Sequence, residues 1–341
     1  MKKTSAILLC ALLAMLTLCG GAAAEKINVV ATIFPIYDWT REVVGENTDS
    51  VELTLLLDSG VDLHSYQPSV QDIVRVSSAD VFLYVGGESD AWVQGALAEA
   101  VNKNQTALSL VEAMGADIKT EEIVEGMEHD HEEDHDHEED HGHEEDHDHE
   151  EDHDHEEDHD HEEEADEHVW LSLRNAQKLV GAIAAALGTA DPDRAAAYQA
   201  NAEAYCEKLA ALDAAYAEAV GQAAHHTVLF GDRFPFRYLL DDYNIDYYAA
   251  FSGCSAESEA SFQTIVFLAG KVDELGLPAV LTIENAHARI AETIVENTKA
   301  KDQKILALNS LQGATAKDAA EGLTYLSAME DNLKVLKEAL N

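Results

Sequence analysis

Positive charge is scarce in this chain of 341 residues. Lys and Arg number 21 against 67 Asp and Glu, and the formal net charge is -46. Residues 129–161 alone carry 20 of the acidic side chains, so the remainder is acidic without being a polyelectrolyte. An acidic surface repels phosphate groups, which argues against nucleic acid and anionic membranes as partners. Cations are the natural ligands of such a chain.

Long apolar runs are also missing beyond the first residues. Two lysines precede a short apolar stretch at residues 7–18, and small residues follow, which predicts an export signal over residues 1–24. The apolar stretch is too short to span a membrane stably. The sequence around Cys19 resembles the site at which bacterial lipoproteins are cleaved and lipidated. We therefore expect an exported protein, periplasmic or held at the cell surface by a lipid anchor at Cys19.

Cysteine is rare as well, with four in the whole chain. If processing removes Cys10 and removes or lipidates Cys19, Cys206 and Cys254 remain. An exported chain could join these two in a disulfide. Two unpaired buried thiols are the alternative, and the sequence leaves both open.

Residues 128–167 differ from the rest of the chain in composition. Positions 129–161 hold only His, Asp, Glu and one Gly, as near-copies of the unit His-Glu-Glu-Asp-His-Asp. Twelve of the chain's 17 His lie there, and imidazole binds zinc, copper, nickel and iron. A run of like charges without an apolar face favours disorder, so we expect a disordered metal-binding insertion over 128–164. An acidic spacer is the alternative, but a spacer does not need His at two of every six positions.

The repeat also matches a metalloprotease motif, His-Glu-x-x-His, at His131, Glu132 and His135. That motif works only on a stable helix whose two His share a face and leave an open zinc position. Low-complexity sequence of this kind does not predict such a helix. The chain also shows no nucleophile–base pair and no phosphate-binding loop, so we expect a binding protein and not an enzyme.

Short β-branched runs alternate with amphipathic stretches on both sides of the insertion, which indicates parallel strands joined by helical crossovers. The predicted strands are residues 26–33, 51–57, 80–85, 106–110, 227–230, 246–250, 279–283 and 304–308. The predicted helices are residues 35–45, 69–78, 91–102, 173–187, 192–220, 235–243, 258–275, 286–300 and 314–340. The helix at 192–220 is Ala-rich and nearly free of breakers.

This order predicts an α/β fold with two lobes. Each lobe has a small, mainly parallel four-stranded sheet with flanking helices, and a long rigid helix joins the two. The predicted division is a lobe at 25–190 that includes the insertion, a connecting helix at 191–221, and a second lobe at 222–341. We expect a ligand-binding cleft between the lobes.

Polar side chains that follow strands are the candidate site residues, because ligands of open α/β sheets bind beyond the carboxyl ends of the strands. Four side chains follow predicted strands in this way: His64, Asp232, Glu284 and Asn309. His168 stands where the acidic insertion gives way to aromatic sequence at Trp170, which we expect to be packed. The remaining His outside the insertion, His225, His226 and His287, are interpreted as surface residues.

Three segments resemble a known family, the zinc and manganese solute-binding proteins of bacterial metal-uptake ABC transporters, also called the zinc-uptake A and adhesin-lipoprotein group. Residues 30–38, Val-Ala-Thr-Ile-Phe-Pro-Ile-Tyr-Asp, open the resemblance. Residues 60–68, which contain His64, resemble the first metal-ligand loop, and residues 167–171, which contain His168, resemble the second. A His-rich acidic insertion before the second loop is typical of the zinc members. The resemblance implies two lobes, bridged by a rigid helix, that hold the metal between them. We expect the protein to be a monomer.

The resemblance leaves two ligands open. The family's third ligand, usually His, falls in a Phe-His-Asp segment, where this chain has Gly231. Its fourth, usually acidic, comes from the loop after the last strand, where this chain has Asn309. Asp232 and Glu284 could supply oxygen ligands instead, although Asp232 could pair with Arg233 and Glu284 could stabilise a helix start. A His or carboxylate of the insertion could also complete a four-coordinate site on His64 and His168.

Together these patterns predict an extracytoplasmic receptor that binds a divalent metal ion and delivers it to an ABC transporter permease. Zinc is the expected metal because His is abundant, while manganese, nickel and copper stay open. The predicted ligands are His64, His168, Glu284 and Asp232, with the insertion as an auxiliary collector. The alternative is a cell-surface storage or delivery protein in which the insertion is the main binding element.

Overall fold

A computed structural model describes residues 26–127, 165–254, 259–284 and 288–341. The predicted signal at 1–24, the anchor at Cys19 and the insertion at 128–164 lie outside the described residues. Contacts divide the chain into two compact units that are discontinuous in sequence. Of the described residues, unit 1 takes in 26–113, 177–208 and 312–325, and unit 2 takes in those within 114–176, 209–311 and 326–341. The division into lobes at 25–190 and 222–341 with a connecting helix at 191–221 stays a prediction.

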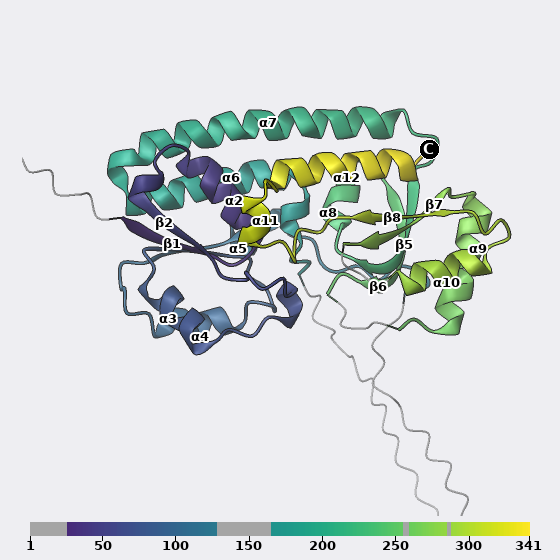
Figure 1. The fold of residues 1–341 in the computed structure, drawn as a ribbon, viewed down its shortest axis with the longest axis horizontal. Coiled ribbons are helices and arrows are strands. Elements are labelled where there is room, and N and C mark those ends of the chain that lie inside the picture. The colour runs from purple at the N-terminus through teal and green to yellow at the C-terminus, as the bar shows by residue number, and fades with distance from the viewer. Residues whose placement is uncertain (1–25, 128–164, 255–258, 285–287) are drawn as a thin grey trace, which may run out of the picture. The chain divides into compact units, whose positions relative to one another are not determined.

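Unit 1 is built on a parallel sheet with strand order β2-β1-β3-β4. Its strands are β1 (Ile27–Ala31), β2 (Val51–Leu55), β3 (Val81–Tyr84) and β4 (Thr106–Ser109). The helices between them are α2 (Phe34–Val44), α3 (Val70–Ser78) and α4 (Trp92–Ala98), and α5 (Leu110–Met114) follows β4. From β1 the chain first crosses to β2 at one edge of the sheet, and it then proceeds through β3 to β4 at the other edge. Because the crossovers are right-handed, α2 lies on one face of the sheet and α3 and α4 lie on the other (Figure 1).

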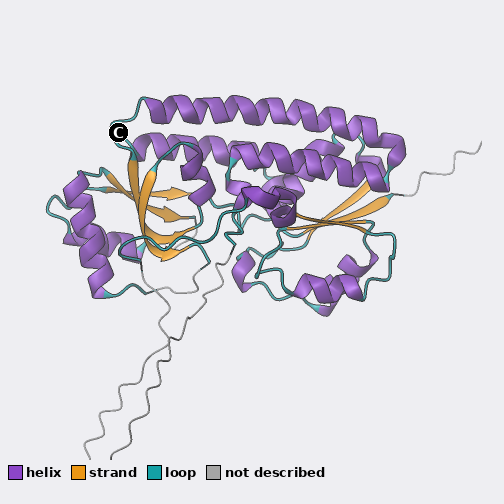
Figure 2. Cartoon of the chain, turned by 180° about the vertical axis from the view of Figure 1, so that it is seen from behind, coloured by secondary structure: helices purple, strands orange, loops and turns teal. Residues whose placement is uncertain are grey.

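Unit 2 repeats this topology with strand order β6-β5-β7-β8, again parallel. Its strands are β5 (Thr227–Phe234), β6 (Asp246–Ser252), β7 (Ala279–Ile283) and β8 (Lys304–Leu308). The crossover helices are α8 (Arg237–Asp242), α9 (Phe262–Leu275) and α10 (Arg289–Asn297). Apolar side chains of β5, β6 and β7 pack against α9 and α10, which lie side by side outside the sheet (Figures 1 and 2). The predicted fold class, two four-stranded parallel sheets with flanking helices, is confirmed.

The remaining helices are α6 (Leu173–Ala190), α7 (Ala195–Gly221), α11 (Ala316–Ala320) and α12 (Tyr325–Ala339). The predicted long helix is present as α7, whose 27 residues follow a single 3-10 turn at Pro192–Arg194. One helix over 314–340 was a wrong prediction: Gly322 has a φ of +106°, which a right-handed helix does not allow, and the chain divides there into α11 and α12. Within the described residues, no helix has the length and apolar character needed to cross a membrane.

One boundary error affects the candidate site. The strand predicted at 227–230 continues to Phe234, with an irregular register between Phe230 and Arg233. The sequence Gly231-Asp232 reads as a strand end, since Gly and Asp are poor strand formers. Burial of the strand against α10 overrides that preference. Asp232 therefore lies inside β5 and not in the loop after it.

A buried carboxylate in unit 1 gives a testable pH dependence. Asp38 on α2 is 1 % exposed and accepts a hydrogen bond from the backbone N–H of Tyr325 (2.8 Å). Burial raises the pKa of Asp38 to about 6 from the ordinary 3.8, against the smaller opposing effects of the Tyr325 N–H and the Arg41 charge. This difference corresponds to about 3 kcal/mol. The free energy of unfolding should fall by that order as pH rises from about 4 to about 6, because the folded protein then holds a buried charge that the unfolded chain hydrates.

An Asp38→Asn variant keeps an acceptor oxygen and cannot ionise. We expect it to be more stable than the parent at pH 7, with the difference vanishing near pH 4. Urea unfolding of both proteins at four pH values, in the presence of a chelator, measures this. Two parallel stability curves would contradict the assignment of this pH dependence to Asp38.

Candidate metal site

His64 of unit 1 is held in a 3-10 turn at Leu63–Ser65 that follows β2. The carboxylate of Asp62 accepts the backbone N–H of His64 (3.0 Å), and Leu63 is 1 % exposed, which fixes the turn to the unit. The ring Nδ1 of His64 lies 2.8 Å from the hydroxyl oxygen of Ser89. With Nδ1–H donated to Ser89, the ring presents the lone pair of Nε2, the atom by which a neutral imidazole binds a metal.

Ser89 was missed by sequence reasoning. It follows β3, and its contact with His64 joins the chain after two different strands of one sheet. Its position after a strand could have identified it. However, only residue types that bind metals directly were considered there, and a serine hydroxyl that orients a metal ligand was not. A partner that fixes the second ring nitrogen of a histidine is a regular part of metal sites.

His168 of unit 2 is fully buried. Its backbone N–H and its ring Nδ1 both lie 2.9 Å from Oδ1 of Asp166. With this carboxylate oxygen as acceptor, a neutral His168 ring donates from Nδ1 and presents the lone pair of Nε2. Trp170 is also fully buried, as predicted, and its indole N–H donates to the Ser310 carbonyl (2.9 Å). The segment therefore presents a pre-oriented imidazole of the carboxylate–histidine kind found at zinc sites.

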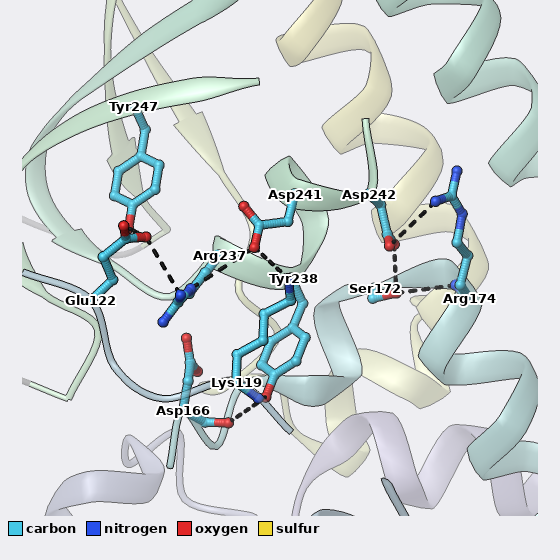
Figure 3. A network of polar contacts seen from close by, with 10 residues as sticks. All are labelled: Lys119, Glu122, Asp166, Ser172, Arg174, Arg237, Tyr238, Asp241, Asp242 and Tyr247. Atoms are coloured by element: carbon cyan, nitrogen blue, oxygen red, sulfur yellow. Dashed lines mark hydrogen bonds and ion pairs between the residues drawn. The ribbon is translucent and has the colours of Figure 1, made fainter. Parts of the chain in front are cut away.

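Helix α8 holds the chain on both sides of residues 128–164. The Tyr238 hydroxyl accepts the backbone N–H of Lys119 (2.9 Å) and donates to the carbonyl of Asp166 (3.0 Å), as Figure 3 shows in part. The backbone N–H of Asp166 donates to the Lys119 carbonyl (2.9 Å), and an isolated antiparallel bridge continues this pairing. The segment that carries His168 is thus tied both to α8 and to the segment before the insertion.

Charged contacts reinforce this attachment within unit 2 (Figure 3). Lys119 forms an ion pair with Asp241, and Arg237 forms one with Glu122 (3.6 Å). On the other side of His168, the Ser172 hydroxyl donates to the Asp242 carboxylate (2.6 Å). Most of these pairs are partly exposed, so each contributes modestly to stability. Their number and placement fix the direction of the chain around His168.

The two predicted carboxylate ligands have hydrogen-bond partners within unit 2. Asp232 accepts the backbone N–H groups of Ile283 (3.1 Å) and Arg233 (2.9 Å), and burial raises its pKa. Glu284 accepts the backbone N–H (2.6 Å) and the hydroxyl (2.7 Å) of Ser310. Among the residues that the structure describes, neither joins a close group of three or more potential ligands. Their role as ligands stays a prediction.

Gly231 marks a place where a larger side chain does not fit. A Cβ there would lie 2.6 Å from Cα and 2.8 Å from N of Ala291, which is backbone of α10. Real Cβ atoms essentially never come so close to backbone, so a histidine at 231 would displace α10. Asn309, the other substituted position, builds its own loop: its side-chain oxygen accepts the N–H of Leu311 (2.8 Å).

Cys254 is a potential ligand that sequence reasoning considered only as a disulfide partner. Cys206 and Cys254 are both free thiols in the structure. The Cys254 sulfur and a ring nitrogen of His168 lie within 4.8 Å of each other. Cys254 follows β6, so its position after a strand was again the signal that could have found it.

Comparison with known proteins places this geometry in a family. The sequence model described as "Zinc-uptake complex component A periplasmic" (ZnuA) matches residues 29–339. The zinc-binding lipoprotein AdcA of Streptococcus pneumoniae serotype 4 is 34% identical over 342 residues, which is 99% of this chain and 61% of that protein. The high-affinity zinc uptake system protein ZnuA of Bacillus subtilis is 30% identical, over 93% of this chain and 88% of that protein.

Solved structures show the same fold. The Zn(II)-bound ZnuA-like domain of S. pneumoniae AdcA has a TM-score of 0.68 at 28% sequence identity, covering 93% of this chain and 99% of that domain. The chain spans about three fifths of the length of full AdcA from S. pneumoniae. With a family match over nearly all of the described residues, this chain belongs to the ZnuA family.

Proposed function

We propose that this chain is an extracytoplasmic receptor that captures a zinc ion and delivers it to the permease of an ABC transporter. The observation that carries the proposal is His168, a fully buried imidazole whose Nδ1 is held by the Asp166 carboxylate. A buried histidine oriented in this way is suited to bind a metal through Nε2. Membership of the ZnuA family and the zinc-binding names of its relatives support zinc as the ion.

The two histidines in the ligand-loop segments form the core of the proposed site. His64 and His168 each have one ring nitrogen oriented by a neighbouring oxygen, from Ser89 and Asp166 respectively. We assign both Nε2 atoms to one ion, on the strength of the two loops and of this shared local geometry. Neutral imidazoles bind the ion, and docking on the permease must lower the affinity enough to release it.

Ligand chemistry narrows the metal. Imidazole suits zinc, nickel and copper, whereas manganese prefers oxygen ligands. Intrinsic affinity favours copper over zinc for such ligands, so the choice of zinc rests on the family and not on imidazole alone. We assign the chain a binding role and no catalytic one. Its export, and lipid attachment at Cys19, agree with the names "lipoprotein" and "periplasmic" among the matches.

The His-rich insertion is proposed as an auxiliary collector. Its flanking segments are tied to each other and to α8, and it ends four residues before His168. Twelve imidazoles in this place would hold several ions beside the proposed site and raise the local zinc concentration. Storage in the insertion as the main activity is the second candidate, and the substitutions at Gly231 and Asn309 favour it.

Anomalous scattering tests the receptor proposal directly. Crystals of the full chain with one equivalent of zinc, measured above and below the zinc absorption edge, should give their strongest difference peak within bonding distance of Nε2 of both His64 and His168. Crystals grown with a chelator serve as the control and should lack the peak. A strongest peak that touches neither histidine would contradict the proposal.

A further inference from the structure

Two ligand-type side chains, one of them outside the predicted set, meet inside unit 2. A ring nitrogen of the fully buried His168 and the sulfur of Cys254 lie within 4.8 Å of each other. In a tetrahedral zinc site with Zn–N near 2.0–2.1 Å and Zn–S near 2.3 Å, these two atoms are about 3.6 Å apart. The separation of the two atoms thus differs by at most about 1.2 Å from the one that a shared ion requires.

The backbone around Cys254 is fitted to the His168 ring. A Cβ on Gly253 would lie 2.9 Å from the carbonyl oxygen of Phe234 and 3.0 Å from Cε1 of His168, so a glycine is needed for the close approach of this backbone. The backbone N–H of Cys254 then donates to the Glu121 carboxylate (3.0 Å), from the segment that α8 holds. The thiol is therefore placed by contacts on both sides and is not a chance neighbour.

The surroundings of the thiol favour a cation. Three carboxylates, those of Glu121, Glu167 and Asp166, interact electrostatically with the Cys254 side chain. These carboxylates create a negative electrostatic potential, which stabilises a divalent cation bound beside the thiol. On binding, the S–H proton leaves to solvent and the sulfur lone pair forms the Zn–S bond.

We propose that Cys254 is a zinc ligand, bound as thiolate beside His168, in place of the histidine that position 231 cannot accommodate. The inference rests on the proposed function and adds to it a ligand of a different chemical class. A sulfur ligand discriminates against manganese, because thiolates bind soft and borderline ions such as Zn²⁺ and bind Mn²⁺ poorly. Together with His64 and His168 it brings the proposed protein ligands to three without the carboxylates of Asp232 and Glu284.

Cobalt(II) provides a spectroscopic test in the full chain. Thiolate bound to Co²⁺ gives an intense near-ultraviolet charge-transfer band, and the insertion cannot contribute because it contains no cysteine. We expect the band in the reduced parent protein and in the matched control Cys206→Ser, and its absence in Cys254→Ser. In competition with a chelator, Cys254→Ser should bind zinc about 100-fold more weakly or worse, since even outer-shell partners of a metal are worth about 10- to 100-fold. Cys206→Ser should match the parent.

The outcomes separate this inference from the receptor function. If the parent holds zinc tightly but shows no thiolate band, or if the band persists in Cys254→Ser, the ligand assignment is overturned and the receptor stands. If the parent holds no zinc tightly, both are overturned. Circular dichroism could show that Cys254→Ser does not fold; the parent and Cys206→Ser spectra then decide. A thiolate band that is present in Cys206→Ser and disappears after alkylation of Cys254 supports the proposal.

Discussion

The double variant His64→Ala/His168→Ala should lose the tightly bound zinc ion. Both imidazoles are proposed as direct ligands, and their removal leaves too few donors for a tetrahedral site. We expect the affinity of the tight site to fall on the order of 10⁴-fold or more, since outer-shell groups alone are worth about 10- to 100-fold each. Competition with a chromogenic chelator measures the tight site separately from the weaker ions on the insertion.

A matched control for this variant is His225→Ala/His226→Ala. These two side chains are at least partly exposed and precede a strand, so their removal takes away the same number of imidazoles without touching the proposed site. The control should keep parent affinity. His168 is fully buried, so circular dichroism must show that the site variant is folded. A folded site variant that still binds zinc as tightly as the parent would favour the storage function instead.

Replacement of residues 128–164 by a short Gly-Ser linker should lower the zinc content from several ions to one tight ion per chain. Twelve of the 17 histidines leave with this segment, whereas His64, His168 and Cys254 remain. The affinity of the remaining ion should stay within about threefold of the parent value, because no proposed ligand is removed. Equilibrium dialysis gives the stoichiometry, and chelator competition gives the affinity.

A length-matched control distinguishes imidazole from carboxylate in the insertion. Changing its twelve histidines to asparagine keeps the acidic charge, and this variant should bind as few ions as the deletion. If it binds as many as the parent, carboxylates hold the extra ions and the segment is an acidic spacer. Loss of all tight binding in the deletion would show that the insertion itself supplies an essential ligand.

The fold was predictable because its information is local. Short β-branched runs alternate with amphipathic stretches, and that alternation alone indicates parallel sheets with helical crossovers. The errors fall where packing overrides local preference. Gly231 and Asp232 read as a strand end, yet β5 continues through them beneath α10. The membership of the units cannot be read locally either, since no pattern in residues 114–127 or 165–176 shows that they belong to the unit of the second sheet.

The site was predictable only in part for the same reason. His64 and His168 lie in sequence segments that are distinctive by themselves. Their partners come from elsewhere: Ser89 reaches His64 from the end of another strand, and Cys254 reaches His168 from the end of β6. The hydrogen bonds that occupy Glu284 depend on a neighbouring loop. The rule that polar residues after strands are candidate ligands identifies single residues, but it does not show which of their side chains lie close together.

The contact between Gly231 and Ala291 also bears on how this scaffold can change its metal preference. An imidazole at 231 requires two coordinated changes, one in β5 and one in the backbone path of α10, and the single substitution alone damages the core. Position 254 already carries a side chain, so the donor there can be exchanged by a single substitution. In directed evolution of the metal ligands, we therefore expect new donor side chains to be tolerated at position 254 but not at position 231.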